Sequence, residues 1–361
     1  MLPRDVFDHC PLVLRGGRWD WGPKPFRFNN FWLSNSNFKG VVEEWRRDGV
    51  NGWMSFVLKT NLKNLKLRLR EWNRAEYSGM EERVERLVDD IKELDEKGEE
   101  VGLEKEEITR KKSKFSDLWK ILRARDASTV QQSRARWMKD GDANSKYFHS
   151  CIKRRSSLNL MKALKVGDGW AVSPFDVRKA VVDYFTNHFS SPLCDRPTLD
   201  GVPFPSLSED ENMCLIAPFS LLEIETVVKD SDGDKSLGPD GYNFTFIKEF
   251  WYLIKDDVRI MFDQFHANGI LPRGMLAFFV TLILKVSSPV EIKDYRPISL
   301  LGCLYKLLAK VLARRMARVM TSIISSNQSG FLKGRNLVDG VMVINELVDY
   351  AKKNKKTMFD S

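Results

Sequence analysis

A lysine and an arginine in the last quarter of the chain have the types and the spacing to bind one phosphate group. Residues 278–285, FFVTLILK, are rich in β-branched and aromatic side chains, and 295–299 is a second short run of this kind. Both runs are predicted strands, and we expect them to pair as a hairpin across 286–294. Lys285 and Arg296 would then lie near each other. The lysine ammonium would bind a phosphate as a point charge, and the arginine guanidinium would bind it through a planar pair of N–H donors.

Pro297 favours this arrangement of the second strand. A proline biases the residue before it towards extended backbone, which suits Arg296. Proline also lacks an N–H group, so it fits the edge of a sheet, where that donor is not needed. The sequence therefore predicts that Arg296 is presented from an edge strand.

A basic helix is expected to follow, beginning near Ser299. Its apolar residues recur on one side, and its basic residues step every four positions along another flank. Such a stripe matches the phosphates of a nucleic acid, but it is equally typical of a solvated helix face. The apolar side holds Leu300, Leu304, Leu308, Val311 and Leu312, and the basic flank holds Lys306, Lys310, Arg314 and Arg318.

The positive charge of the chain is concentrated in the same region. The 361 residues carry a formal net charge of +9, and residues 281–361 contain 14 lysines and arginines against six aspartates and glutamates. A local surplus of this kind suggests a polyanionic partner, because phosphate binding releases counterions. A basic face that only keeps the protein soluble is the alternative.

Cysteine usage and hydropathy limit the class of protein. The five cysteines show no CxxC pair and are odd in number, which argues against a zinc site and against a disulfide framework. The first residues, MLPRDVFDHC, do not have the pattern of a signal peptide. The most apolar run, 275–284, is about half as long as a membrane-spanning helix. We expect an intracellular protein without a membrane partner.

The middle of the chain reads as helices followed by mixed structure. Residues 60–125 show helical periodicity, with breaks expected at 78–79 and 98–102. A strand, a Gly-Asp-Gly turn and a second strand follow between 161 and 172, and Ser173 is the expected N-cap of the next helix. A proline-rich connector at 192–205 precedes further helices at about 220–230 and 244–267, the last closed by Gly269.

Several segments, in order and near the expected spacing, resemble the polyproteins of plant non-LTR (LINE-type) retrotransposons. The chain is similar to their reverse transcriptase in four blocks, to their linker at SRARWMKDGDANSKYFHSCIKRRSSLN, and to the last strands of their apurinic-type endonuclease at DHCPLVL and KPFRFNNFWL. The four blocks are KSLGPDGYN, VTLILK, DYRPISLLGCLYKLLAKVLARRM and NQSGFLKGRNLVDGVMVINELV.

The resemblance implies a role for each matching residue. Lys285 and Arg296 stand where the family contacts the incoming triphosphate, in agreement with the hairpin argument. Gly238, Pro239, Asp240 and Gly241 match a turn of the fingers domain, although an ordinary loop before a helix would look the same. Gln328, Ser329, Gly330 and Phe331 match a block near the template and nucleotide, and a plain polar turn is the alternative.

The acidic residues that the endonuclease and the reverse transcriptase of this family need are not found in the expected patterns. Asp8 and His9 resemble the pair that ends the endonuclease motif, but Phe7 replaces its serine, so they are interpreted as a remnant. Nucleotidyl transfer needs carboxylates that hold two Mg²⁺ ions. Asp360 lies in roughly the right region without the usual pattern around it, and the pairs at 89–90 and 256–257 fall in predicted helices. No metal site is assigned, and both reactions are expected to be absent.

The sequence thus predicts an α+β fragment in four consecutive parts. They are the C-terminal remnant of an endonuclease/exonuclease/phosphatase-like sandwich (1–38), a helical linker (39–160), a mixed connector (161–230), and the fingers with the start of the palm of a reverse transcriptase (231–361). RNA or DNA is the expected partner, a deoxynucleoside triphosphate is a further ligand, and the family implies a nuclear location.

Two other functions remain open. A domesticated nucleic-acid-binding protein would use the basic C-terminal third and residues 134–155, which interleave seven cations with Trp137, Tyr147 and Phe148. A helical scaffold would use the helices of 60–125.

Overall fold

The computed structural model describes most of the chain. The described residues are 20–45, 49–133, 145–161, 163–190, 200–201, 203–325, 327–328, 330–332 and 334–354. They form two compact units that are each discontinuous in sequence. Unit 1 contains the described residues of Met1–Pro25, Gln132–Asp195 and Val280–Ser299, and unit 2 contains those of Phe26–Gln131, Arg196–Phe279 and Leu300–Ser361. Each unit combines segments that lie far apart in the chain.

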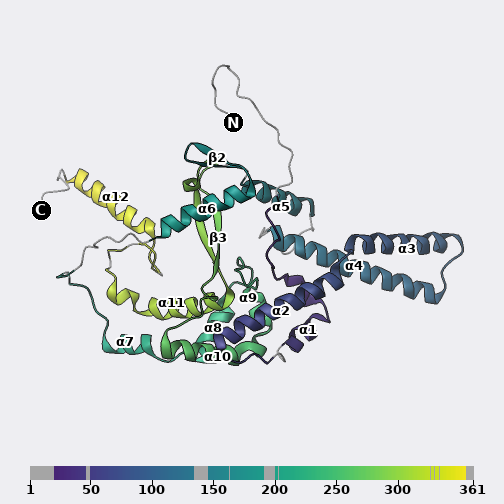
Figure 1. Cartoon of the computed structure of the whole chain (residues 1–361), viewed down its shortest axis with the longest axis horizontal. Helices are drawn as coiled ribbons and strands as arrows, with labels where there is room; N and C mark the ends of the chain where they lie inside the picture. The colour runs from purple at the N-terminus through teal and green to yellow at the C-terminus, as the bar shows by residue number, and fades with distance from the viewer. Residues whose placement is uncertain are drawn as a thin grey trace, which may run out of the picture. The chain divides into compact units, whose positions relative to one another are not determined.

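Unit 2 is built almost entirely of helices (Figure 1). Its core combines a leucine face with aromatic side chains from several segments. The helices are α1 (Phe38–Trp45), α2 (Met54–Tyr77), α3 (Met80–Glu100), α4 (Lys105–Ser133), α7 (Glu209–Ile216), α8 (Leu221–Asp230), α9 (Phe244–Glu249), α10 (Trp251–Asn268), α11 (Cys303–Ile323) and α12 (Leu337–Lys353), together with the 3₁₀ turn η1 (Asn30–Ser34).

Helix α2 supplies the leucine face. Leu58, Leu62, Leu65 and Leu69 recur at helical spacing and are buried in the core of unit 2. Residues 24–33, KPFRFNNFWL, expected to match an endonuclease strand, form no strand; Phe26 and Phe28 are buried in this core instead. Aromatic burial explains the difference, because the edge-to-face contact of Phe28 with Phe246, at 5.2 Å between ring centroids, replaces the pairing that a strand would need.

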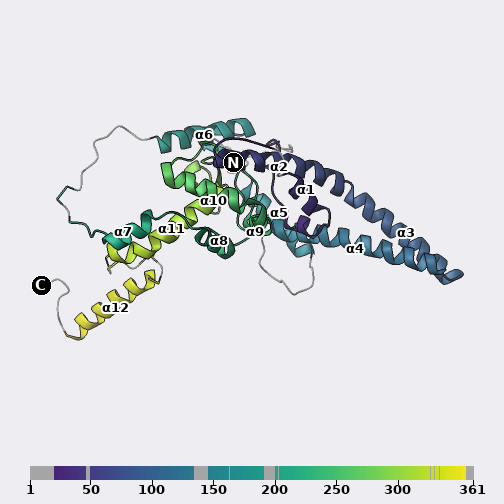
Figure 2. The same ribbon diagram turned by 90° about the horizontal axis from the view of Figure 1, so that it is seen from below.

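The boundaries between the long helices lie at glycines, as the sequence predicts. Gly79 (φ 66°) precedes α3 and Gly102 (φ 87°) separates α3 from α4, both in the left-handed region that glycine adopts at little cost. Helices α3 and α4 run side by side in Figure 1 and Figure 2. Ion pairs join their facing sides, with Lys97 Nζ 2.5 Å from Glu107 Oε1 and Lys114 paired with Asp90.

Unit 1 combines α5 (Ser145–Asn159), α6 (Pro174–Phe189) and the two-stranded sheet of β1 (Leu164–Val166) and β2 (Gly169–Ala171). The predicted strand, turn and strand are confirmed, with Lys165 opposite Trp170 in an antiparallel pair. Ser173 caps α6 as expected, because its hydroxyl accepts a hydrogen bond from the N–H of Asp176 at 3.1 Å. The predicted connector is described only at 200–201 and 203–205.

The predicted hairpin is also present, as β3 (Phe278–Leu284) and β4 (Tyr295–Leu301), with the 3₁₀ turn η2 (Ile292–Asp294) between them. Two boundaries differ from expectation. Helix α11 begins at Cys303 rather than near Ser299, because β4 continues to Leu301. The helix expected at 244–267 is two helices that meet at Phe250.

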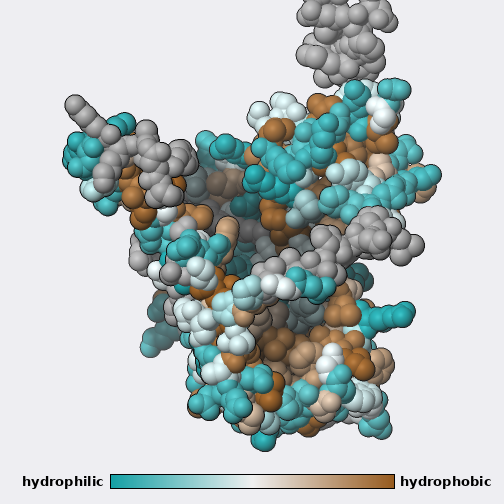
Figure 3. Space-filling model, turned by 90° about the vertical axis from the view of Figure 1, so that its left-hand side faces the viewer, coloured by the Kyte–Doolittle hydropathy of each residue, from teal (hydrophilic) through white to brown (hydrophobic). Residues whose placement is uncertain are grey.

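Helix α12 buries none of its side chains. Its apolar residues lie on every side of the helix, and most are more than half exposed. Apolar patches reach the surface on the side of the molecule that Figure 3 shows. None of the helices in the described ranges is both long and apolar enough to span a bilayer. The exposed residues of α12 are Leu337, Val338, Val341, Met342, Val343, Ile344, Leu347 and Tyr350.

Candidate nucleic-acid interface

One backbone bond sets the register of the β3–β4 hairpin. The N–H of Lys285 donates to the carbonyl of Asp294 at 2.8 Å. In an antiparallel pair this bond places Lys285 opposite Asp294 and Ile283 opposite Arg296. Residues that are opposite, or two positions from opposite, share one face. Lys285 and Arg296 are therefore diagonal neighbours on the same face of the hairpin.

The two faces of the hairpin have different environments. Leu282, Leu284 and Tyr295 pack in the core of unit 1, against Leu164 and its neighbours. The opposite face carries Ile283, which is 45% exposed, together with exposed Lys285 and Arg296. The alternation of buried and exposed residues thus directs both cations to solvent.

The loop between the strands holds Lys285 in place. The ammonium of Lys285 donates to the carbonyl of Lys293 at 2.8 Å. Asp294 Oδ2 accepts from the N–H groups of Glu291 and Val290, both at 2.9 Å, and these bonds hold the pKa of Asp294 below its ordinary value. Arg296 makes no ion pair with any residue that the structure describes, so its guanidinium remains open to a ligand.

The Gly-Pro-Asp-Gly loop lies inside unit 2. Asp240 Oδ2 accepts a 2.5 Å bond from the N–H of Cys303 at the first turn of α11, where Gly302 has no side chain to do so. A Cβ on Gly238 would stand 2.2 Å from the carbonyl oxygen of Leu301. Gly241 has a φ of 81°, and its carbonyl accepts from the N–H of Phe28. This geometry gives the loop a structural role in joining distant segments.

Most of the predicted cationic stripe on α11 has partners within unit 2. Lys306 Nζ donates to the carbonyl of Ser236 at 2.6 Å, Lys310 Nζ donates to Ser231 Oγ at 2.9 Å, and Arg314 pairs with Asp230 at 2.7 Å. Burial lowers the pKa of Lys306 and of Lys310. Arg318, by contrast, is exposed. The stripe therefore anchors residues 230–236 more than it offers charge to a partner.

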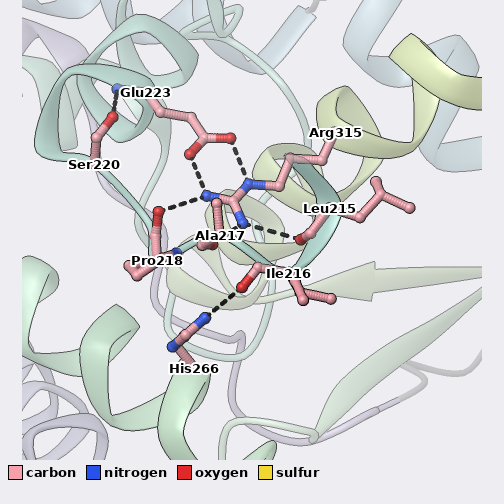
Figure 4. A network of polar contacts seen from close by, with 8 residues as sticks. All are labelled: Leu215, Ile216, Ala217, Pro218, Ser220, Glu223, His266 and Arg315. Atoms are coloured by element: carbon pink, nitrogen blue, oxygen red, sulfur yellow. Dashed lines mark hydrogen bonds and ion pairs between the residues drawn. The ribbon is translucent and has the colours of Figure 1, made fainter. Parts of the chain in front are cut away.

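Arg315, which the sequence reasoning passed over, is the most deeply buried cation among the described residues. Its guanidinium forms two bonds with the Glu223 carboxylate, at 2.8 and 2.7 Å, and donates to three carbonyls at the end of α7 and just after it (Figure 4). Those carbonyls belong to Leu215, Ala217 and Pro218. The guanidinium carbon also lies 4.1 Å from the ring centroid of Phe219.

A signal for Arg315 was present in the sequence. It lies four residues after Val311, on the apolar side of α11 rather than on the basic flank. A charge on that side is buried unless the helix end is exposed, and a buried charge requires a partner. The hydrogen bonds from Arg315 are the largest cause of the lowered pKa of Glu223.

The Gln-Ser-Gly-Phe block forms an irregular segment after α11. Ser329 lies outside the described residues. Phe331 is 93% exposed and has a φ of 65°, which is uncommon for a residue with a side chain. The guanidinium of Arg335 donates to the carbonyl of Gln328 at 2.7 Å. The side-chain amide of Gln328 also donates to the carbonyl of Gly330 at 3.5 Å.

The predicted acidic pairs lie in helices, as expected. Residues 89–90 belong to α3 and 256–257 to α10. Within the described ranges no three acidic, histidine or cysteine side chains gather as metal ligands do. Asp8, His9 and Asp360 lie outside the described residues.

The basic and aromatic segment 134–155 is described only from residue 145. Trp137 therefore lies outside the described residues. Phe148 is buried in α5, with its ring centroid 5.5 Å from that of Tyr147, whereas Tyr147 is exposed.

Comparison with known proteins shows that the sequence of the chain is similar to that of a transposon protein. It is 26% identical over 346 residues to the uncharacterized 149 kDa protein of transposon TX1 from Xenopus laevis. The similarity covers 91% of this chain but 26% of that protein, so the chain spans about a quarter of its relative's length. No protein-family model matches the chain. The chain is therefore related to a transposon protein over nearly all of its length.

Replacing Arg315 should destabilise unit 2 strongly. Arg315→Met leaves the Glu223 carboxylate buried without its partner, and the expected loss is about 3–5 kcal/mol in the free energy of unfolding. The neighbouring change Arg314→Met removes an exposed pair with Asp230 and should cost about 0–1 kcal/mol. Urea unfolding of both variants measures the difference. If both variants lost the same free energy of unfolding, the burial of Arg315 would add nothing to the stability of unit 2.

Acid should remove the contribution of the same pair. Because the pKa of Glu223 is lowered in the folded protein, its stabilisation is complete above the ordinary value of 4.5 and is lost as the pH falls through the lowered pKa. The stability gap between the wild type and Glu223→Gln should therefore be widest near neutral pH and shrink below 4.5. Unfolding midpoints across this range test it. Glu96→Gln, which changes an exposed acid paired with Lys92, should show a small gap throughout.

Proposed function

We propose that this chain is a segment of a non-LTR retrotransposon polyprotein and that its β3–β4 hairpin binds the phosphates of a nucleic acid or of a nucleoside triphosphate. The proposed segment runs from the end of an endonuclease, through a helical linker, into the fingers of a reverse transcriptase. Similarity to a transposon protein over 346 residues supports the origin. The motifs quoted from the sequence support the finer assignment.

The single observation that carries the binding proposal is the shared exposed face of Lys285 and Arg296. Adjacent strands in a sheet lie about 4.8 Å apart, so diagonal neighbours on one face reach a common ligand with long side chains. A lysine and an arginine together supply a mobile point charge and a planar pair of donors, which suits a phosphate with several oxygens. The apolar surface at Ile283 between them suits the sugar or the base.

The basic residues of α11 contribute less to the binding of such a partner. Lys306, Lys310, Arg314 and Arg315 already bind oxygens within unit 2. Of the two hairpin cations, Lys285 donates to the carbonyl of Lys293, whereas Arg296 makes no ion pair with any residue that the structure describes. Binding should therefore depend on two residues more than on the total charge.

Single-strand binding measured across a salt series tests the hairpin. Fluorescence anisotropy with a labelled RNA should show an affinity that falls steeply with salt, because phosphate contacts release counterions. Lys285→Ala/Arg296→Ala should lower the magnitude of the slope by about 1.4, from roughly 0.7 per lost phosphate contact on a single strand.

The matched control for this double variant is Lys120→Ala/Arg259→Ala. It also removes one exposed lysine and one exposed arginine, whose partners are acids on their own helices. Its slope should equal that of the wild type. If both double variants lose the same affinity, the partner responds to net charge and the hairpin is no specific site.

Primer extension should be absent from this chain when it is tested alone. The reaction needs carboxylates that hold two Mg²⁺ ions. The acidic pairs of α3 and α10 lie in helices, and no group of three possible metal ligands occurs in the described ranges. Incubation with a primed RNA template, deoxynucleoside triphosphates and Mg²⁺ measures the product directly. Robust extension would contradict this expectation while leaving the binding proposal intact.

A further inference from the structure

A cavity of about 250 Å³ opens within unit 2. Helix α2, the Gly-Pro-Asp-Gly loop, the segment before β3 and the start of α11 all contribute to it. Its floor is apolar, and three lysines of α2 stand at its walls. The floor and its surroundings consist of Leu62, Met275, Ala277, Leu304, Tyr305 and Pro239.

The lysines follow the helical repeat of α2. Lys59, Lys63 and Lys66 are separated by four and then three residues, so they share one flank of the helix. Lys59 and Lys63 are exposed, and neither forms an ion pair with any residue that the structure describes. Lys66 donates to the carbonyl of Pro239 at 3.1 Å, and burial followed by the charge of Arg70 lowers its pKa. Two ammonium groups are thus available to an anion at the cavity.

Asp240 adds one acceptor to a lining of apolar side chains and three lysines. Its Oδ2 is engaged by the N–H of Cys303 at 2.5 Å, and its Oδ1 accepts a bond of 3.4 Å from the N–H of Tyr242. A carboxylate oxygen accepts more than one hydrogen bond. A ligand that offers an N–H donor would therefore find a partner here.

The size of the cavity limits what it encloses. Cavities that surround a whole drug-sized ligand measure about 300–1,000 Å³, so this one holds one apolar group and leaves the rest outside. The enclosed group must have apolar faces and an N–H edge, and the part outside must carry negative charge. A fatty acid lacks the N–H edge, and inorganic phosphate lacks the apolar part.

We propose that this cavity binds a nucleotide whose base carries an exocyclic amino group. The base would lie over the apolar floor beside Tyr305 with its amino group donating to Asp240, and the phosphate would lie among Lys59 and Lys63. The ligand is either a free mononucleotide or one nucleotide unit of a single strand, since both present the same chemistry. The site lies wholly within unit 2, so it does not depend on the hairpin.

Calorimetric titration of the full chain with defined probes tests the site. The probes are adenosine monophosphate, purine riboside monophosphate, which lacks only the amino group, inorganic phosphate and a pentanucleotide of adenosine. Adenosine monophosphate should bind about two- to tenfold more tightly than purine riboside monophosphate, the range for one hydrogen bond, and inorganic phosphate should bind more weakly than either. Binding of the pentanucleotide but not of the monophosphate would identify a strand as the source.

Two variants act on different parts of the site. Lys59→Ala/Lys63→Ala removes the phosphate partners and should weaken the adenosine ligand at least about tenfold, as expected for two charge-assisted bonds. Ala277→Phe fills the floor without touching a charge and should weaken it as well. Lys92→Ala/Lys120→Ala removes two exposed lysines of α3 and α4 and is the matched control, with unchanged binding.

The outcomes separate this site from the hairpin. Lys285→Ala/Arg296→Ala should leave binding of the adenosine ligand unchanged, even if it abolishes the salt-dependent binding of RNA. The proposal is overturned if neither adenosine probe binds, if inorganic phosphate binds as tightly as the nucleotide, or if Ala277→Phe and Lys59→Ala/Lys63→Ala both bind like the wild type while remaining folded by circular dichroism.

Discussion

Unit 2 depends on the bond between the Asp240 carboxylate and the backbone N–H of Cys303. The first N–H groups of a helix lack partners within it, and Gly302 has no side chain to supply one. The acceptor comes from a residue 63 positions earlier, so the first turn of α11 is fixed only when the chain has folded. The close approach of Gly238 to Leu301 has the same effect, because any side chain at Gly238 would meet that carbonyl. One loop thereby joins the start of α11 to the core that contains α2.

Cations serve two purposes in this protein. Arg315 and the basic flank of α11 bind carbonyls and carboxylates, and a buried guanidinium with five donors satisfies several of them at once. Lys285, Arg296, Lys59 and Lys63 are exposed and have no acidic partner among the described residues. The formal charge of +9 therefore overstates what a polyanion meets, and the position of each charge matters more than the sum.

The similarity to a transposon protein and the geometry of the hairpin support one proposal from different directions. The first concerns origin and covers a quarter of the relative. The second concerns chemistry, because Leu282, Leu284 and Tyr295 pack on one face of the hairpin and the two cations lie on the other. Helix α12 exposes its apolar side chains, and α7 also has no buried residue.

The sequence by itself determined the local elements: the helices interrupted at Gly79 and Gly102, the Ser173 cap, and the β3–β4 hairpin. Each depends on a periodic pattern or a turn residue that acts over a few positions. Only the tertiary structure decided which segments share a core, that Phe26 and Phe28 leave strand geometry for an aromatic cluster, and that Arg315 is buried while Arg314 beside it is not. Those outcomes depend on contacts between residues far apart in the chain, whose energies of burial and desolvation have no local signature.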